Sequence, residues 1–228
     1  MDYVFEPAPQ ASLAVVGSKK RFPVRRVFCV GRNYGAHARE MGHDPDREPP
    51  FFFTKPADAV IDMPEKWPYP PETSDLHHEI ELVVMIGKGG QNIDKSVAND
   101  HIFGYAVGLD MTRRDLQGAA KKLGRPWDWG KAFDFSAPCG PVYPIEETGL
   151  IESGEIWLKV NGQVRQTGDI ADLIWSVPEV IEIISRSMTL QPGDVIMTGT
   201  PAGVGAVVAG DQISAGIDRL SKIETMVF

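Results

Sequence analysis

The sequence has few cysteines and no long apolar run. Only two of its 228 residues are cysteines, Cys29 and Cys139, and they do not form a C-x-x-C pair. Two cysteines are too few for the disulfide framework of a small secreted protein. No apolar run approaches the roughly 20 residues that a membrane-spanning helix needs, and the N-terminus lacks the pattern of a signal peptide. We therefore expect a cytoplasmic protein that is not embedded in a membrane.

Common catalytic signatures and an excess of basic charge are also missing. The motifs H-E-x-x-H, G-x-S-x-G, the P-loop and a dinucleotide-binding G-x-G-x-x-G are absent, which argues against the corresponding enzyme classes. Lys and Arg number 23 against 31 Asp and Glu, for a net charge of −8. Because an acidic chain repels polyanions, we expect no nucleic acid and no anionic membrane as a partner. A small anion could still bind in a locally basic pocket.

Short apolar runs rich in β-branched and aromatic residues predict a fold made mainly of strands. Helices are predicted over 33–41 with Asn33 as N-cap, from a capping box at Thr112 to Gly124, and over 176–187. Strands outnumber helices and do not alternate with them, which favours an α+β, mainly-β architecture. The sequence predicts strands over residues 26–30, 51–54, 79–86, 103–110, 155–160, 195–198 and 212–214, with a hairpin turn at Asn161-Gly162.

The run His77-His-Glu-Ile-Glu-Leu-Val-Val-Met-Ile86 is the strongest chemical feature. Side chains alternate along a strand, so Glu79 and Glu81 share one face, and both faces become apolar beyond them. Two buried carboxylates repel each other unless they take up protons or a cation bridges them. Carboxylates suit Mg²⁺, Mn²⁺ or Ca²⁺. A solvent-exposed strand end is an equally good explanation of the pattern alone.

Asp110 ends the next predicted strand, on a face that otherwise holds Gly104, Ala106 and Gly108. Such small residues permit close approach of another chain segment. If this strand pairs beside Glu79 and Glu81, Asp110 completes a set of three carboxylates.

His37 and Glu40 are spaced to face one side of the predicted helix. A carboxylate beside an imidazole fixes its tautomer and raises its basicity, which would make His37 a general base. On the spacing alone, a surface pair with no catalytic role is the simpler explanation.

Two further segments could bind anions. Six cations gather between Arg113 and Lys131, and on a helix Arg114, Gln117 and Lys121 would share one face; that face could be solvated or could line a cleft. The turn that begins at Thr198-Gly-Thr-Pro is rich in glycine and could present backbone N–H groups to an oxyanion or could be a plain tight turn.

These segments, in this order, resemble the fumarylacetoacetate hydrolase family from about Pro23 to Phe228. The resemblance rests on Cys29-Val-Gly-Arg-Asn-Tyr-Gly-Ala-His-Ala-Arg-Glu40, Phe53-Thr-Lys-Pro56, His78-Glu-Ile-Glu-Leu82, Gly104–Thr112 with Arg114-Asp-Leu-Gln117, Lys131-Ala-Phe-Asp134, Gly140-Pro141 and Thr198-Gly-Thr-Pro-Ala-Gly-Val204. It implies a mixed β-sandwich or roll over 23–228, with residues 1–22 as an N-terminal extension packed on the core, and a homodimer.

The resemblance also implies roles for individual residues. Mg²⁺ or Mn²⁺, with Ca²⁺ as a further option, would be bound by Glu79, Glu81 and Asp110. Catalysis would involve His37 and Glu40 as the water-activating pair, and Lys131 as a cation beside the metal. The implied substrate contacts are Arg32, Tyr34, Arg114, Gln117, Gly199 and Thr200, with the remote carboxylate on Arg114, Gln117 and Thr200. Eight of the 18 prolines lie between Pro45 and Pro71, and this segment would belong to a lid.

The implied activity is hydrolysis of a C–C bond in an acylpyruvate, a small anionic dicarbonyl acid. The run over residues 46–58 and the N-terminal start resemble enzymes that cleave 3-fumarylpyruvate to fumarate and pyruvate in gentisate-type aromatic catabolism. Relatives leave open an oxaloacetate decarboxylase and a 5-carboxymethyl-2-hydroxymuconate-type isomerase or decarboxylase. A non-catalytic carboxylate-binding module is the alternative from another class.

Overall fold

Strands outnumber helices in the computed structural model, which describes residues 2–35 and 48–228. A main sheet has the order β4-β3-β15-β8-β9-β11-β5, and β12 pairs with β9. It mixes antiparallel pairs with the parallel pairs β15–β3 and β11–β5. Its strands are β3 (Arg26–Gly31), β4 (Phe51–Lys55), β5 (Val60–Asp62), β8 (Ile80–Ile86), β9 (Ile102–Leu109), β11 (Ala137–Cys139), β12 (Tyr143–Pro144) and β15 (Asp194–Met197).

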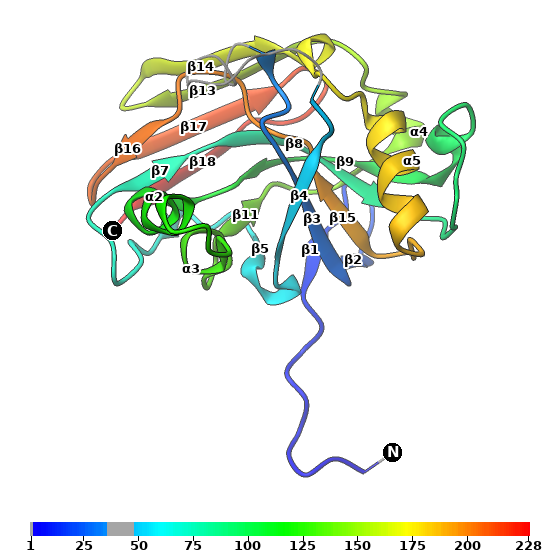
Figure 1. Cartoon of the computed structure of the whole chain (residues 1–228), viewed down its shortest axis with the longest axis horizontal. Coiled ribbons are helices and arrows are strands. Elements are labelled where there is room, and N and C mark those ends of the chain that lie inside the picture. The colour runs from blue at the N-terminus through cyan, green and yellow to red at the C-terminus, as the bar shows by residue number, and fades with distance from the viewer. Residues whose placement is uncertain (1, 36–47) are drawn as a thin grey trace.

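A second sheet covers one face of the main sheet, as Figure 1 shows. Its order is β14-β13-β17-β18-β6, and its strands are β6 (Lys66–Trp67), β13 (Glu155–Val160), β14 (Gln163–Asp169), β17 (Gln212–Ile217) and β18 (Ile223–Val227). A small third sheet has the order β10-β7-β16, formed by β7 (Leu76–His78), β10 (Thr112–Arg113) and β16 (Gly205–Val207). The predicted mainly-β, mixed-sheet architecture is confirmed.

Helices are short and lie at the edges of the sheets (Figure 1). They are the α-helices α2 (Arg114–Lys122), α3 (Asp128–Lys131), α4 (Ile145–Thr148) and α5 (Val177–Ser187), and the 3₁₀ helices η1 (Ala57–Ala59), η2 (Ala98–His101) and η3 (Ile170–Asp172). No helix in the described part of the chain is both long and apolar enough to cross a membrane.

All seven predicted strands are present, and so is the hairpin. β13 and β14 pair antiparallel around Asn161 and Gly162, whose φ angles are 52° and 76°. α5 begins as predicted, since the Glu179 carboxylate accepts a hydrogen bond from the Ser176 N–H at 3.1 Å. The helix predicted over 33–41 falls mostly on residues 36–47, outside the described residues.

The capping box predicted at Thr112 is wrong. Thr112 lies in β10, and α2 begins two residues later, at Arg114. The Thr112 hydroxyl donates to Glu79 Oε1 at 3.2 Å instead of capping the helix. Asp115, the expected partner in the box, accepts hydrogen bonds from Thr73 and Ser74.

β8 is the central strand of the core, and apolar layers cover both of its faces. Leu82 and Val84 pack in the larger cluster, together with Ile156 and Leu158 of the second sheet. Val83 and Met85 pack on the other side in a smaller cluster. The strand is fully buried from Ile80 to Ile86, as the apolar pattern on both faces predicts.

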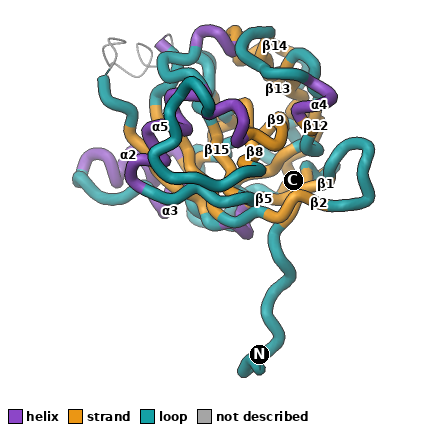
Figure 2. Tube along the Cα trace, turned by 90° about the vertical axis from the view of Figure 1, so that its right-hand side faces the viewer, coloured by secondary structure: helices purple, strands orange, loops and turns teal. Residues whose placement is uncertain are grey.

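The first residues of the chain leave the body of the protein. β1 (Ser12–Ala14) and β2 (Arg21–Pro23) form a small two-stranded sheet. Before them, residues 2–10 extend outward and are exposed (Figures 1 and 2). The division of the chain at residue 22 stays a prediction.

Candidate active site

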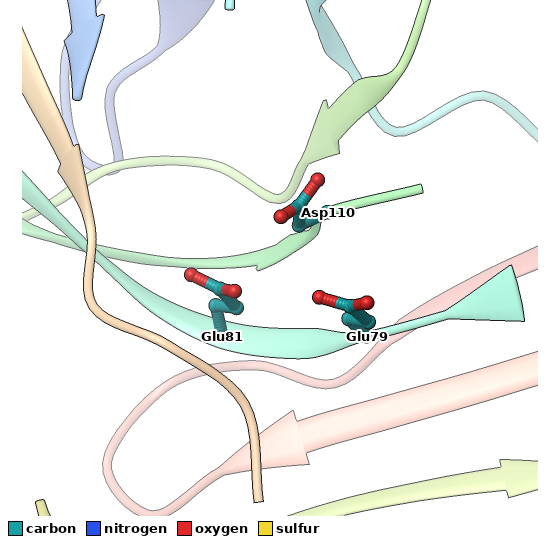
Figure 3. A group of neighbouring side chains, drawn as sticks. All are labelled: Glu79, Glu81 and Asp110. Atoms are coloured by element: carbon teal, nitrogen blue, oxygen red, sulfur yellow. The ribbon is translucent and has the colours of Figure 1, made fainter. Parts of the chain in front are cut away.

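Three carboxylates meet at one end of β8 and β9. Glu79 lies between β7 and β8, Glu81 lies in β8, and Asp110 directly follows β9. Their exposed fractions are 6%, 2% and 0%. One oxygen of each lies within 4.8 Å of the others, and Figure 3 shows the three side chains grouped together.

Antiparallel pairing of β8 with β9 brings these acids together. Glu81 pairs with Gly108, and the Asp110 N–H donates to the Glu79 carbonyl at 2.8 Å. The sequence analysis included Asp110 in the set of three carboxylates only if its strand pairs beside Glu79 and Glu81. This pairing is present. The explanation of Glu79 and Glu81 as an exposed strand end does not hold, because both are buried.

Three cations surround the carboxylates. Lys131 Nζ lies 2.9 Å from Glu79 Oε2 and 2.6 Å from Asp110 Oδ2. Lys55 Nζ lies 2.9 Å from Asp110 Oδ1, and the Arg114 guanidinium binds Glu79 Oε1. Burial alone would lower the pKa of Lys131, but the charges of Asp110 and Glu79 outweigh it and raise the pKa. In the metal-free site the two carboxylates therefore favour the charged form of Lys131.

Glu81 differs from the other two acids because no Lys or Arg of the described residues forms an ion pair with it. Its Oε2 accepts the Gly199 N–H at 2.8 Å. Burial first, and then the charges of Asp110 and Glu79, raise the pKa of Glu81 well above its ordinary value. A divalent cation among the three carboxylates would favour the ionised form of Glu81, and oxygen ligands of this kind fit Mg²⁺ or Mn²⁺.

α2 turns its polar face toward the carboxylates. Gln117 is its only buried residue, and Leu123, just beyond the helix, is 61% exposed. Arg114, Gln117 and Lys121 all line the pocket that contains the three acids. Of the two possibilities that the sequence left open, the helix lines a cleft.

The turn after β15 closes another side of the pocket. Gly199 adopts a φ of +101°, and a Cβ there would lie 2.8 Å from the Cβ of Asn33. Only glycine fits this position without strain. Gly199 and Thr200 line the pocket, and the Gly199 N–H points at Glu81, so the turn contributes to the site and is not a plain tight turn.

Gln166 of β14 joins this turn to the strand that carries the acids. Its Oε1 accepts from the Ile80 N–H at 3.1 Å and lies 2.9 Å from His78 Nδ1. Its Nε2 donates to Thr200 Oγ1 at 2.7 Å and to the Pro201 carbonyl at 2.8 Å. Because the Thr200 oxygen accepts this bond and Thr200 lines the pocket, its own O–H is available as a donor.

Arg32 and Tyr34 have different environments. Arg32 lines the pocket, and its guanidinium lies 5.2 Å from the ring centre of Phe51. Tyr34 is buried, and it is not among the residues that line this pocket. Burial, followed by the charge of Glu81, raises the pKa of Tyr34. His37 and Glu40 lie outside the described residues.

The sequence analysis missed several residues of the site. Lys55 lies at the end of β4, and its Nζ pairs with Asp110; a lysine that ends an apolar strand was the available signal. Gln166 gave no signal, because its neighbours in β14 are mostly exposed. Trp127 and Phe53 also line the pocket, and their aromatic side chains alone did not indicate it.

Comparisons with known proteins identify one family model and relatives that match most of the chain. The family model described as fumarylacetoacetate (FAA) hydrolase C-terminal matches residues 26–228. A mitochondrial oxaloacetate tautomerase of Arabidopsis thaliana is 44% identical over 199 residues, which cover 87% of this chain and 89% of that protein. A fumarylpyruvate hydrolase of Ralstonia sp. is 45% identical over 189 residues, 82% of this chain and 98% of that protein.

Solved structures show the same fold. The crystal structure of fumarylpyruvate hydrolase from Pseudomonas aeruginosa in complex with Mn²⁺ and pyruvate has a TM-score of 0.97 to this chain. The two sequences are 53% identical, and the match covers 99% of each chain.

Proposed function

Because the chain belongs to the fumarylacetoacetate hydrolase family, we propose that it is a divalent-metal-dependent acylpyruvate hydrolase. The proposed reaction is cleavage of 3-fumarylpyruvate by water to fumarate and pyruvate. Two relatives support this substrate, the Ralstonia fumarylpyruvate hydrolase and the P. aeruginosa enzyme whose structure contains Mn²⁺ and pyruvate.

The observation that carries the proposal is the buried set of three carboxylates, in which Glu81 has no cationic partner among the described residues. Glu79, Glu81 and Asp110 would hold Mg²⁺ or Mn²⁺. When bound, the ion would polarise the oxo group of the substrate and offset negative charge that develops during the reaction.

The cations of the chain supply the remaining electrostatics. Lys131 lines the pocket, and we assign it a positive charge beside the enolate that C–C cleavage leaves on pyruvate. Arg114 is bound to Glu79, which places its guanidinium at the carboxylate end of the pocket. We assign Arg114, Gln117 and the Thr200 hydroxyl to substrate oxygens at this end, and not to the remote carboxylate that the sequence suggested.

The assignment of the general base rests on the sequence alone. His37, oriented by Glu40, would take a proton from water, whose oxygen attacks the distal keto carbon. The C–C bond of the resulting tetrahedral intermediate then breaks, and the proton passes to the enolate carbon, so that water is consumed and two acids are released.

A spectrophotometric assay tests the proposed function. We expect the absorbance of 3-fumarylpyruvate to fall when Mg²⁺ or Mn²⁺ is present. When a chelator is added, we expect this absorbance to stay constant. Turnover that survives complete removal of metal would contradict the proposal.

Oxaloacetate is the second candidate substrate, because the Arabidopsis oxaloacetate tautomerase is 44% identical. Tautomerisation or decarboxylation of oxaloacetate needs no attack by water. Turnover of oxaloacetate in the same assay, with 3-fumarylpyruvate left intact, would favour this alternative.

A further inference from the structure

Two cations at the pocket have no acidic partner among the described residues. The three carboxylates are matched in number by Lys55, Lys131 and Arg114. Arg32 and Lys121 line the same pocket, and neither forms an ion pair with any acid in residues 2–35 and 48–228. Desolvating a charge is costly, so two uncompensated cations in one pocket favour an anionic ligand.

The two cations lie near each other. Burial, then the charges of Arg32 and Arg114, lower the pKa of Lys121. Mutual repulsion of this kind raises the free energy of the empty pocket, and an anion placed between the cations relieves it.

Arg32 is held in place before any ligand arrives. Its φ of +56° is uncommon for a residue with a side chain. Its guanidinium lies over the Phe51 ring, and this ring lies so close to Gly31 that a Cβ there would be 2.1 Å from it. Beside it, the buried Asn33 amide donates to the Thr198 and Trp175 carbonyls.

α2 sets how far Lys121 lies from the three carboxylates. Arg114, bound to Glu79, and Lys121 share a helix face and are seven residues apart. At a rise of 1.5 Å per residue, this spacing is about 10 Å along the axis. Lys121 therefore enters the pocket about two helical turns further from Glu79 than Arg114 does.

We propose that Arg32 and Lys121 form a subsite for a second carboxylate, so that the enzyme selects acylpyruvates whose acyl tail carries a negative charge. This inference rests on the proposed function, since it assumes that the pyruvate end lies at Glu79, Glu81 and Asp110. The selected class includes 3-fumarylpyruvate and excludes 2,4-dioxopentanoate, whose tail is a methyl group.

Kinetics with both substrates test the subsite. We expect Lys121→Met to lower kcat/KM for 3-fumarylpyruvate at least tenfold more than for 2,4-dioxopentanoate, mainly through KM, and Arg32→Met to act in the same direction. Lys122→Met is the matched control, because Lys122 is the exposed neighbour outside the pocket. An equal loss on both substrates, or no loss, would overturn the subsite.

A binding measurement keeps the subsite testable apart from the reaction. Calorimetry on the Mn²⁺-loaded protein would compare 2-oxoheptanedioate with 2-oxoheptanoate, which differ only in the terminal carboxylate and lack the cleavable dicarbonyl. We expect at least tenfold tighter binding of the dianion, and loss of this preference in Lys121→Met. Equal affinities in the wild type would overturn the subsite even if acylpyruvates are hydrolysed. Absence of acylpyruvate turnover with the preference intact would instead contradict the proposed function.

Discussion

Glu81 is a buried acid that forms no ion pair with any Lys or Arg in the described part of the chain. It is 2% exposed, and the Gly199 N–H is a neutral donor. A buried carboxylate without a cation costs several kcal/mol. In the metal-free protein Glu81 avoids this cost by taking up a proton, because its pKa is raised, and a bound cation would replace that proton.

The variant Glu81→Gln separates metal binding from stability. Even an outer-shell partner is worth about 10–100-fold in metal affinity, so we expect at least a hundredfold loss of Mn²⁺ affinity by calorimetric titration. The amide can still accept the Gly199 N–H, so the midpoint temperature of thermal unfolding (Tm) in chelator should equal or exceed that of the wild type. Glu224→Gln, at a side chain that is 61% exposed, is the control; unchanged Mn²⁺ affinity in Glu81→Gln would remove Glu81 from the ligands.

Gln166 is a positioning residue. In Gln166→Met, the buried Ile80 N–H and the His78 ring lose their acceptor, and an unsatisfied buried group costs about 1–3 kcal/mol. We expect the free energy of urea unfolding to fall by at least this amount and KM for 3-fumarylpyruvate to rise, because Thr200 loses its orientation. Gln163→Met, at an exposed position of the same strand, should change neither; a variant of Gln166 with native stability would show that its four hydrogen bonds are replaceable.

At the scale of elements, α2 is unusual because it turns polar side chains, and not apolar ones, toward the interior of the protein. Its polar face borders the pocket, while Leu123 is exposed. Surface substitutions usually change stability by less than about 0.5 kcal/mol. We therefore expect Leu123→Gln to leave the urea midpoint unchanged within that margin, whereas Gln117→Leu should reduce turnover. A large loss of stability in Leu123→Gln would mean that this side chain is covered in solution.

Elements that form from local pattern were predictable, and those that form only by pairing were not. β3, β8 and β9 are long apolar runs, and the α5 capping box is a local signal. β6, β10 and β12 have two residues each, and nothing in so short a stretch distinguishes a strand from a loop. Threonine is a common N-cap residue, but Thr112 lies in β10, where its hydroxyl donates to Glu79, a residue distant in sequence.

The candidate site divides in the same way. The carboxylates and Lys131 were predictable because alternation and family resemblance marked them. The pairing of these carboxylates with cations was not predictable, since it depends on the ion pair between Lys55 of β4 and Asp110. Gln166 acts through four hydrogen bonds to residues distant in sequence, and a single glutamine gives no pattern.

At the scale of the whole molecule, metal should stabilise the fold without being required for it. Apolar clusters on both faces of β8 form without any contribution from the three carboxylates. At metal concentrations about 100 times the Kd, linkage adds about 2.7 kcal/mol, and each kcal/mol raises the Tm of a chain this size by about 2–4 °C. Differential scanning calorimetry should show a cooperative transition in chelator and a higher Tm with Mn²⁺. A chain that is unfolded in chelator would make the metal structural.

The orientation of α2 makes substrate length a property that can be redesigned. Position 118 lies on the same face as Arg114 and Lys121, and a Cβ built on Gly118 would meet nothing within 4 Å. Moving the cation from 121 to 118 would bring it about 4.5 Å closer to the carboxylates. The distance between this cation and the three carboxylates would then match a shorter dianion, and we expect the enzyme to prefer that dianion.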